Sequence, residues 1–333
     1  MKRDFAKEEE FYSKEFQFSY SSLNKLLFSP TLFYRDYILG EKEEKTDKHL
    51  VEGKLIHCLL FEPQNLNKKF NVVPAKVPTD SVRKVLQVMK EHPFRPVSLL
   101  STEAPHLDLI LKTLESENLY QTLKEDSKRL EKIQTQDNDT YWQFLNSSVL
   151  DIVDPDTLAR CQEQVDTIKN NKDVMALFES AQTDFELDPV KTYTEQPLMI
   201  QKLNDYPFGL KGIVDFYKVD DQKKEVIICD LKTTSKTIMD FKETIDFYNY
   251  WLQMAIYGRL VYENLSEDQK GYEILCKFVV IDKYNQVYVF DVGENTLLEW
   301  GTSLIDTLQM AQYHYEQRNY SLPYIFLNQK IVL

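Results

Sequence analysis

The sequence of 333 residues lacks several features that would place it in other classes of protein. Glycine is scarce, with 8 residues, and there is neither a Gly/Ser-rich linker nor an internal repeat, so the composition indicates a packed globular protein. Because no run of about 18 apolar residues occurs, we expect no membrane-spanning helix. The first residues are charged and contain no apolar segment, so we expect no secretory signal.

Cysteine is also rare and irregularly placed. The four cysteines are Cys58, Cys161, Cys229 and Cys276, and no two of them form a CxxC pair. This spacing matches neither a zinc site nor an iron–sulfur site, and three of the four lie within apolar runs. Such residues are typical of buried thiols in a reducing compartment, so we expect a cytoplasmic protein.

Positive charge is in deficit, since the net charge is −13. A protein that simply coats nucleic acid is usually basic. If DNA is a partner, its contacts must therefore come from a local basic surface or from metal ions held by carboxylates. The phosphate-binding pattern GxxxxGK[ST] is absent, which excludes an ATPase built on that loop.

The first half of the chain has the pattern of helices. We expect a charged arm at 1–16 and two short helices within 19–39, with Ser19 or Ser21 as a cap and Pro30 near the start of the second. Further helices are predicted at 50–61 and 155–180. The segment 64–150 mixes a proline-bearing extended part with amphipathic helical segments and carries no recognisable motif.

The second half alternates between strands and helices. Short runs rich in Val, Ile, Tyr and Thr at 191–200, 210–219 and 225–234 predict an antiparallel meander. A helix at 248–263, strands at 272–282 and 286–292, and a helix at about 294–318 follow. The order predicts an α/β (α+β) fold with a mixed central sheet, flanked by helices and preceded by a helical region.

Two opposite charges end the most apolar of these strands. Asp230 and Lys232 follow the run VIIC, whereas other acid–x–lysine pairs of the chain lie in polar surroundings. Side chains two apart on a strand share a face, so both charges would be desolvated there unless something binds them. Asp215 follows another apolar pair, 15 residues earlier, and a hairpin would place it beside Asp230.

Two carboxylates so close repel each other unless a cation lies between them, and oxygen ligands suit Mg²⁺ or Mn²⁺. Lys232, on the same face, would then contact a water molecule or a phosphate oxygen. The alternative from the residues alone is a structural Asp–Lys ion pair at the end of a strand.

At this point the sequence resembles the PD-(D/E)xK nuclease superfamily, in particular its RecB-like branch. Four segments carry the resemblance in the expected order: a GxxxH helix at Gly53–His57, a GxxD element at Gly212–Asp215, DLKTT at Asp230–Thr234, and a QxxxY helix at Gln253–Tyr257. The opening segment SSLNKLLFSPTLFYRDY also fits and extends the likeness to nearly the whole chain. The likeness is strongest to exonuclease VIII (RecE-type) nuclease domains, which phages and prophages often carry.

The resemblance implies a restriction-endonuclease-like core and a set of roles. His57, Asp215, Asp230 and the carbonyl of Leu231 would ligate a divalent cation, and Lys232 would orient or deprotonate the attacking water. Glu195, on the strand before Asp215, would lie near the metal or water; an exposed strand residue is its alternative interpretation. The resemblance also places Gln253 and Tyr257, which are four apart and share a helical face, near the catalytic lysine or the DNA.

One departure from the family is informative. Its iron–sulfur members, such as Cas4 and AddB, have a cysteine before the proline of the opening segment, where this chain has Ser29 before Pro30. Serine cannot replace a thiolate ligand of iron, and a C-terminal cysteine cluster is also missing. We therefore expect no iron–sulfur cluster. For the domains, we expect one nuclease domain over 17–333, with a helical insertion at about 64–150 and a catalytic core at about 190–290.

The function implied by the resemblance is a Mg²⁺-dependent exonuclease that resects linear duplex DNA, 5′→3′, for recombination. A single-strand annealing protein would be its partner, and RecE-type nucleases can form rings around DNA. The alternatives are an endonuclease of the same superfamily and a non-catalytic DNA-binding protein on this fold. The presence of Asp215, Asp230 and Lys232 together argues against the last, because a lapsed site would be expected to lose at least one of them.

Overall fold

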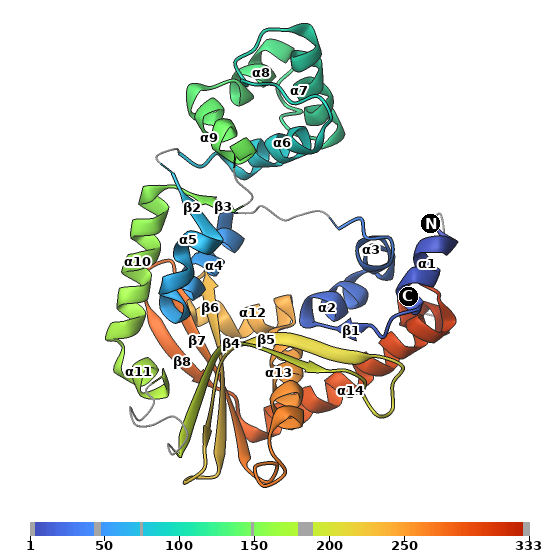
Figure 1. Cartoon of the computed structure of the whole chain (residues 1–333), viewed down its shortest axis with the longest axis vertical. Coiled ribbons are helices and arrows are strands. Elements are labelled where there is room, and N and C mark those ends of the chain that lie inside the picture. The colour runs from blue at the N-terminus through green and yellow to red at the C-terminus, as the bar shows by residue number, and fades with distance from the viewer. Residues whose placement is uncertain (1–3, 43–47, 74–75, 148–149, 179–188, 329–333) are drawn as a thin grey trace. The chain divides into compact units, whose positions relative to one another are not determined.

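The chain divides into two compact units that differ in secondary structure. The computed structural model describes residues 4–42, 48–73, 76–147, 150–178 and 189–328 (Figure 1). Unit 1 is built from Met1–Glu43 together with Thr167–Leu333, and unit 2 from Glu44–Asp166. Unit 2 is therefore inserted in the sequence between the two parts of unit 1. The insertion expected at about 64–150 falls inside unit 2, and the core expected at about 190–290 falls inside unit 1.

Unit 1 contains the main sheet and most of the long helices. Its strands are β1 (Gln17–Phe18), β4 (Val190–Ile200), β5 (Gly209–Asp220), β6 (Glu225–Thr234), β7 (Glu273–Asp282) and β8 (Val287–Asp291). Its helices and helical turns are α1 (Phe5–Tyr12), α2 (Tyr20–Phe28), α3 (Pro30–Phe33), η1 (Tyr34–Ile38), α11 (Lys172–Phe178), η3 (Ile238–Asp240), α12 (Phe241–Tyr248), α13 (Tyr250–Asn264), α14 (Glu294–Gln317) and α15 (Tyr324–Asn328).

The six strands form one mixed sheet in the order β1–β5–β6–β7–β8, with β4 on the other edge of β5. The pairs β4–β5, β5–β6 and β7–β8 are antiparallel, whereas β6–β7 and β1–β5 are parallel. This confirms the predicted mixed sheet, its antiparallel meander and the α/β class. Strand β6 is buried among its neighbours because Val226 to Leu231 is an almost uninterrupted apolar run.

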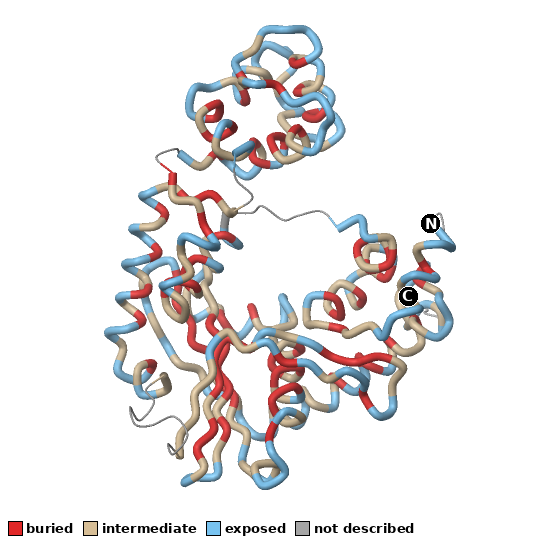
Figure 2. Tube along the Cα trace, viewed as in Figure 1, coloured by how far each residue is buried: buried red, intermediate tan, exposed pale blue. Residues whose placement is uncertain are grey.

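Helix α13 covers the face of the sheet that carries the core of unit 1. It contacts β4, β5, β6 and β7, and α14 and α2 pack against it in turn. Val226 and Ile228 of β6 alternate toward this core, so Asp230 and Lys232, which continue the alternation, point the same way. Figure 2 shows the buried residues of unit 1 concentrated along these strands and α13.

The N-terminal segment expected as a charged arm instead contains a helix that packs on unit 1. Asp4 caps α1 by accepting hydrogen bonds from two backbone N–H groups of its first turn. Phe11 and Tyr12 pack against the main core, and the Tyr12 hydroxyl bonds that of Tyr320 over 2.7 Å. The aromatic side chains of this segment account for the difference, because they bury apolar area on residues near the other end of the chain.

The predicted helix at 155–180 is interrupted at one residue. Helix α10 (Pro155–Asn170), along which the boundary between the units falls, ends where Asn171 begins a new helix. The Asn171 side-chain oxygen accepts hydrogen bonds from the N–H groups of Asp173 and Val174, and so caps α11. Residues 179 and 180 of the predicted helix lie outside the described residues.

Unit 2 is mainly helical and has its own core. Its elements are α4 (Lys48–Phe61), η2 (Pro63–Asn65), α5 (Leu66–Lys69), β2 (Phe70–Val72), α6 (Asp80–Glu91), α7 (Ala104–Ser116), α8 (Asp126–Ile133), α9 (Gln136–Ser147) and β3 (Asp151–Val153), with β2 and β3 parallel. Trp142 is fully buried at its centre and donates its indole N–H to the carbonyl of Pro96 at 2.9 Å. In the described parts of both units, no helix has the length and apolar character that crossing a membrane requires.

At Gly209, the first residue of β5, the backbone of a neighbouring segment approaches very closely. A Cβ atom on Gly209 would lie 2.1 Å from the carbonyl oxygen of Ile200 and 2.2 Å from that of Gln201. Since both atoms belong to the backbone, we expect Gly209→Ala to lower the free energy of unfolding by about 1–3 kcal/mol or more. Thermal and urea unfolding followed by circular dichroism measure the change.

Gly301→Ala is the matched control, because Gly301 lies within α14 and a Cβ there meets nothing within 4 Å. Alanine should stabilise that helix by up to about 1 kcal/mol. Equal stability of the two variants would contradict the close approach at Gly209.

Candidate active site

The site begins where β5 and β6 separate. Their register ends at the pair Phe216↔Cys229, so Asp215 and Asp230 occupy the next opposed positions. There the Leu231 N–H donates its hydrogen bond to the Asp215 side chain, at 2.9 Å from Oδ2, in place of a backbone carbonyl of β5. At the far end of β5, its edge is instead taken by β1, which pairs with Gly209 and Leu210. The two aspartates are therefore brought together at a fork between strands.

Asp230 is the most deeply buried acid of this fork. Its residue is 0% exposed and Asp215 is 7% exposed. The Lys232 ammonium pairs with Asp230 Oδ2 at 2.7 Å, whereas Oδ1 accepts no hydrogen bond from any residue that the structure describes. A buried carboxylate with an unpaired oxygen is destabilising unless cations offset its charge. Asp230 therefore fits a residue that binds a cation in addition to Lys232.

Lys232 is held by three groups from two elements. Besides Asp230, its ammonium donates to Oε1 of Gln253 at 2.8 Å and lies 4.4 Å from the ring centroid of Tyr250. Burial acts to lower the pKa of Lys232, but the charges of Asp230 and Asp215 outweigh it and hold the pKa above its ordinary value. Lys232 is therefore a positively charged group, and its neighbours hold its ammonium beside the fork.

Gln253 connects Lys232 to Tyr257. The Gln253 amide donates to the Tyr257 hydroxyl at 2.8 Å, so its oxygen is oriented toward the lysine. Burial raises the pKa of Tyr257 well above its ordinary value, so the phenol stays neutral. A Cβ on Gly212 of β5 would lie 3.3 Å from Tyr257 Cε1 and 3.0 Å from Leu260 Cδ1. The absence of a side chain at Gly212 thus lets α13 approach the strand closely.

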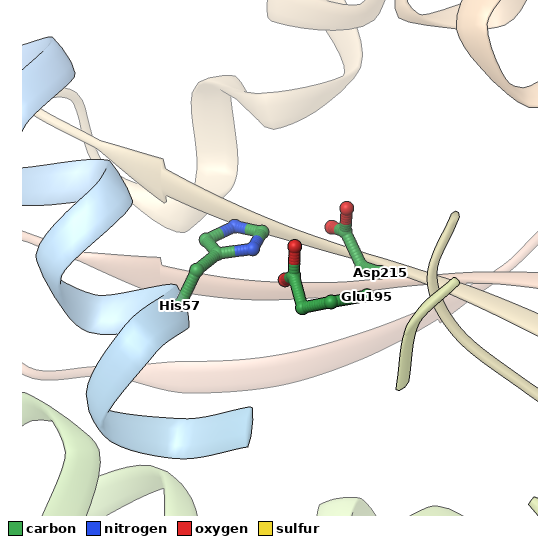
Figure 3. A group of neighbouring side chains, drawn as sticks. All are labelled: His57, Glu195 and Asp215. Carbon is green, nitrogen blue, oxygen red and sulfur yellow. The ribbon is translucent and has the colours of Figure 1, made fainter. Parts of the chain in front are cut away.

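Glu195 stands opposite Asp215 on the other neighbouring strand. The register of β4 and β5 runs through Thr194↔Phe216 and Gln196↔Val214 on either side of it. The backbone of Glu195 has a φ of 46°, a left-handed conformation that costs a non-glycine residue about 1–3 kcal/mol. Figure 3 shows its carboxylate beside that of Asp215, and the oxygens that face each other lie within 4.8 Å.

Two predicted site residues remain, one in each unit. Leu231 is buried between Asp230 and Lys232 on β6. His57, the third side chain labelled in Figure 3, belongs to α4 of unit 2, is half-buried and has its ring centroid 6.0 Å from that of Phe61.

The structure also places side chains that the sequence patterns did not assign to the site. Tyr250, whose ring lies against Lys232, has a signal in the sequence, because it precedes Gln253 by three and so shares its helical face. The left-handed backbone of Glu195 has no such signal. Within unit 1, the site thus contains three carboxylates, a lysine and a hydrogen-bonded Gln–Tyr pair.

Carboxylate oxygens in this number and position are what Mg²⁺ and Mn²⁺ prefer as ligands. The fit is supported by the buried Asp230 oxygens and by the approach of Glu195 to Asp215. Such an arrangement belongs to a class of proteins that hydrolyse phosphodiesters.

The chain belongs to the PD-(D/E)XK nuclease superfamily, whose sequence model matches residues 17–313. This confirms the superfamily suggested by the resemblance, and members of it use divalent metals. No curated protein matches the chain.

Several solved structures are similar to it, and two of them illustrate the range. One is a protein from Eubacterium rectale that is provisionally described as an exonuclease, with 10% identity over 100% of this chain and 96% of that one and a TM-score of 0.48. The other is a protein called SSO0001, with 13% identity over 68% of this chain and 84% of that one and a TM-score of 0.23.

The Asp230–Lys232 pair can be tested through stability alone. Lys232→Met leaves the buried Asp230 carboxylate without its neighbouring cation, which should lower the free energy of unfolding by about 3–5 kcal/mol in EDTA. Denaturant unfolding at constant pH measures the difference.

Lys277→Met on the adjacent strand β7 is the matched control. Its partner Asp291 has a side chain that is 75% exposed, so its loss should lower stability by less than about 1 kcal/mol. If both variants were equally stable, the pairing of Asp230 with Lys232 would not be what stabilises the fork.

Proposed function

We propose that this nuclease is a divalent-metal-dependent DNA exonuclease that digests linear duplex DNA. The observation that carries the proposal is the fork itself, where the buried Asp230 and its neighbour Asp215 converge beside Lys232. The sequence resemblance to RecE-type domains supports 5′→3′ resection, with a single-strand annealing protein as partner. It also favours a homo-oligomeric ring, and the four cysteines without a CxxC pair favour a cytoplasmic location.

The proposed metal ligands are Asp215, Asp230 and the Leu231 carbonyl, with His57 of unit 2 as a neutral ligand. When bound, Mg²⁺ or Mn²⁺ activates a water molecule and neutralises charge on the scissile phosphate. Lys232 and the cation would share the Asp230 carboxylate, since the ammonium lies nearest to one of its two oxygens. Glu195, beside Asp215, would accept a hydrogen bond from water or complete the ligand set.

Lys232 is the group that would act on the nucleophile and the phosphate. Its ammonium is oriented by Gln253, which Tyr257 orients in turn, so little reorganisation accompanies the reaction. A fixed cation at this point stabilises the negative charge that develops on the phosphate in the transition state. We therefore assign Gln253 and Tyr257 as positioning residues.

The first experiment follows the release of nucleotides from linear duplex DNA. Wild-type protein should be active with Mg²⁺ or Mn²⁺ and inactive in EDTA. Asp230→Asn and Lys232→Met should each lower the rate roughly 100-fold or more, because both act on the charge of the transition state. Activity that persists in EDTA, or that neither substitution lowers, would rule out the proposed chemistry.

Matched controls separate chemistry from charge and folding. Asp291→Asn and Lys277→Met change the same residue types in the pair between β7 and β8, whose acid is exposed, and should retain the wild-type rate. On α4, His57→Ala should raise the Mg²⁺ concentration needed for half-maximal rate roughly 10-fold or more. Substitutions at metal sites commonly weaken metal affinity by this amount. His49→Ala, with a side chain 76% exposed on the same helix, should leave that concentration unchanged.

The second experiment separates exonuclease from endonuclease. An exonuclease should degrade linear duplex DNA and leave covalently closed circles of the same sequence intact. Duplexes labelled at the 5′ or the 3′ end then assign polarity, and 5′→3′ digestion should release the 5′ label first. Linearisation of closed circles would favour the alternative, an endonuclease of the same superfamily.

A further inference from the structure

A line of aromatic rings runs from the active-site lysine to the surface of unit 1. Lys232 lies over Tyr250, whose ring stacks on that of Tyr248 with centroids 5.5 Å apart and planes at 25°. Phe247 meets Tyr248 edge to face at 4.8 Å, and the Lys236 ammonium lies 6.0 Å from the Phe247 centroid. We call the three rings of Phe247, Tyr248 and Tyr250 the aromatic ladder.

The outer part of the aromatic ladder is exposed. Phe247 is 75% exposed and Tyr248 is 47% exposed, and Met239, in the turn before α12, is 89% exposed. Isolated exposed apolar residues are common, but these rings contact one another and continue to the half-buried Lys232. The packing of the core therefore does not account for their exposure, and a ligand that covers them would.

Hydrogen bonds to α2 fix the corner that carries the rings. Asn249, between α12 and α13, has a left-handed φ of 56°. The Tyr20 hydroxyl donates to the Tyr248 carbonyl at 2.5 Å, and the Asn249 amide donates to Oδ1 of Asn24 at 2.8 Å. The aromatic ladder is thus held in place before any ligand binds, which lowers the entropy lost on binding.

We propose, on the basis of the nuclease function above, that the aromatic ladder stacks the bases of unpaired nucleotides next to the active site. Aromatic side chains bind single strands independently of sequence, because every base has a π-face. The ladder is continuous with Lys232, and Lys236 supplies a second cation at its outer end for phosphate. The substrate strand would therefore reach the carboxylates as a single strand, separated from its complement.

The charges around α12 indicate that base stacking, rather than phosphate binding, is the main contribution of this surface to affinity for a single strand. Glu243 and Asp246 are exposed on α12, beside a single exposed lysine, Lys242. These acids repel phosphate groups, so base faces are the part of the strand that this surface favours. The contribution of the ladder to affinity should consequently depend little on salt concentration.

The test measures binding to a single-stranded oligonucleotide that carries 2-aminopurine near its end, with Ca²⁺ as the divalent cation and product formation checked on gels. Fluorescence anisotropy reports affinity, and quenching of 2-aminopurine reports stacking. Phe247→Ala should weaken affinity roughly 10-fold and reduce the quenching, because base stacking on one aromatic ring contributes this much. Phe247→Tyr keeps a ring and should restore both signals.

Phe326→Ala is the matched control, since Phe326 is 55% exposed on α15 of the same unit. It should bind like the wild type. Blunt duplex should show a smaller effect of Phe247→Ala than single strand. Unchanged affinity and quenching in Phe247→Ala would overturn the proposal. A Phe247→Ala variant that changes its oligomeric state but binds the oligonucleotide like the wild type would also overturn it, because the ladder would then be an interface between copies of the chain.

The experiment distinguishes this proposal from the nuclease function on which it rests. Cleavage by wild type together with no effect of Phe247→Ala refutes the ladder alone. Absence of cleavage by wild type in Mg²⁺ refutes the nuclease function, while binding that depends on Phe247 would still establish the ladder as a nucleic-acid surface.

Discussion

The arrangement of the site depends on one hydrogen bond, from the Leu231 N–H to the Asp215 carboxylate. The backbone groups of a buried strand must be paired, so β6 can leave β5 only if something replaces the lost ladder bond. Asp215 provides the replacement, and its own charge is then fixed at the fork. Asp230 and Lys232 can then follow on the same face of β6, beyond its pairing with β5, without leaving the Leu231 N–H unsatisfied. The same carboxylate thus stabilises the backbone and prepares a cation site.

The fork concentrates groups that would be unfavourable elsewhere. Asp230 is fully buried with one oxygen that accepts no hydrogen bond from the described residues, and Glu195 adopts a left-handed backbone. Natural proteins accept such strain where binding or chemistry requires it. The surrounding structure compensates through the Lys232–Gln253–Tyr257 connection and through the close packing of α13 on Gly212. Stability and reactivity are therefore set by neighbouring residues of the same few elements.

Much of unit 1 could be predicted from the sequence, because its patterns are local. The apolar run before Asp230 defines β6, and period-two alternation places Lys232 on the same face. The docking of α1 could not be predicted, since the aromatic partner of Tyr12 is Tyr320, some three hundred residues along the chain. The break at Asn171 and the φ of Glu195 depend on side-chain capping and strand register. Tyr250 shares a helical face with Gln253, but a tyrosine in an apolar helix more often packs in a core than lines a site.

The insertion of unit 2 between the parts of unit 1 has a consequence for biosynthesis. Phe18 and Phe33, which emerge early from the ribosome, pack on Phe208 and Tyr320, which emerge much later. The first helices must therefore wait, with apolar surface uncovered, while unit 2 can complete its core on local contacts. We therefore expect the inserted segment to fold first during translation and the catalytic sheet last. A ribosome that stalls before the final helices would release a chain whose sheet lacks part of its cover.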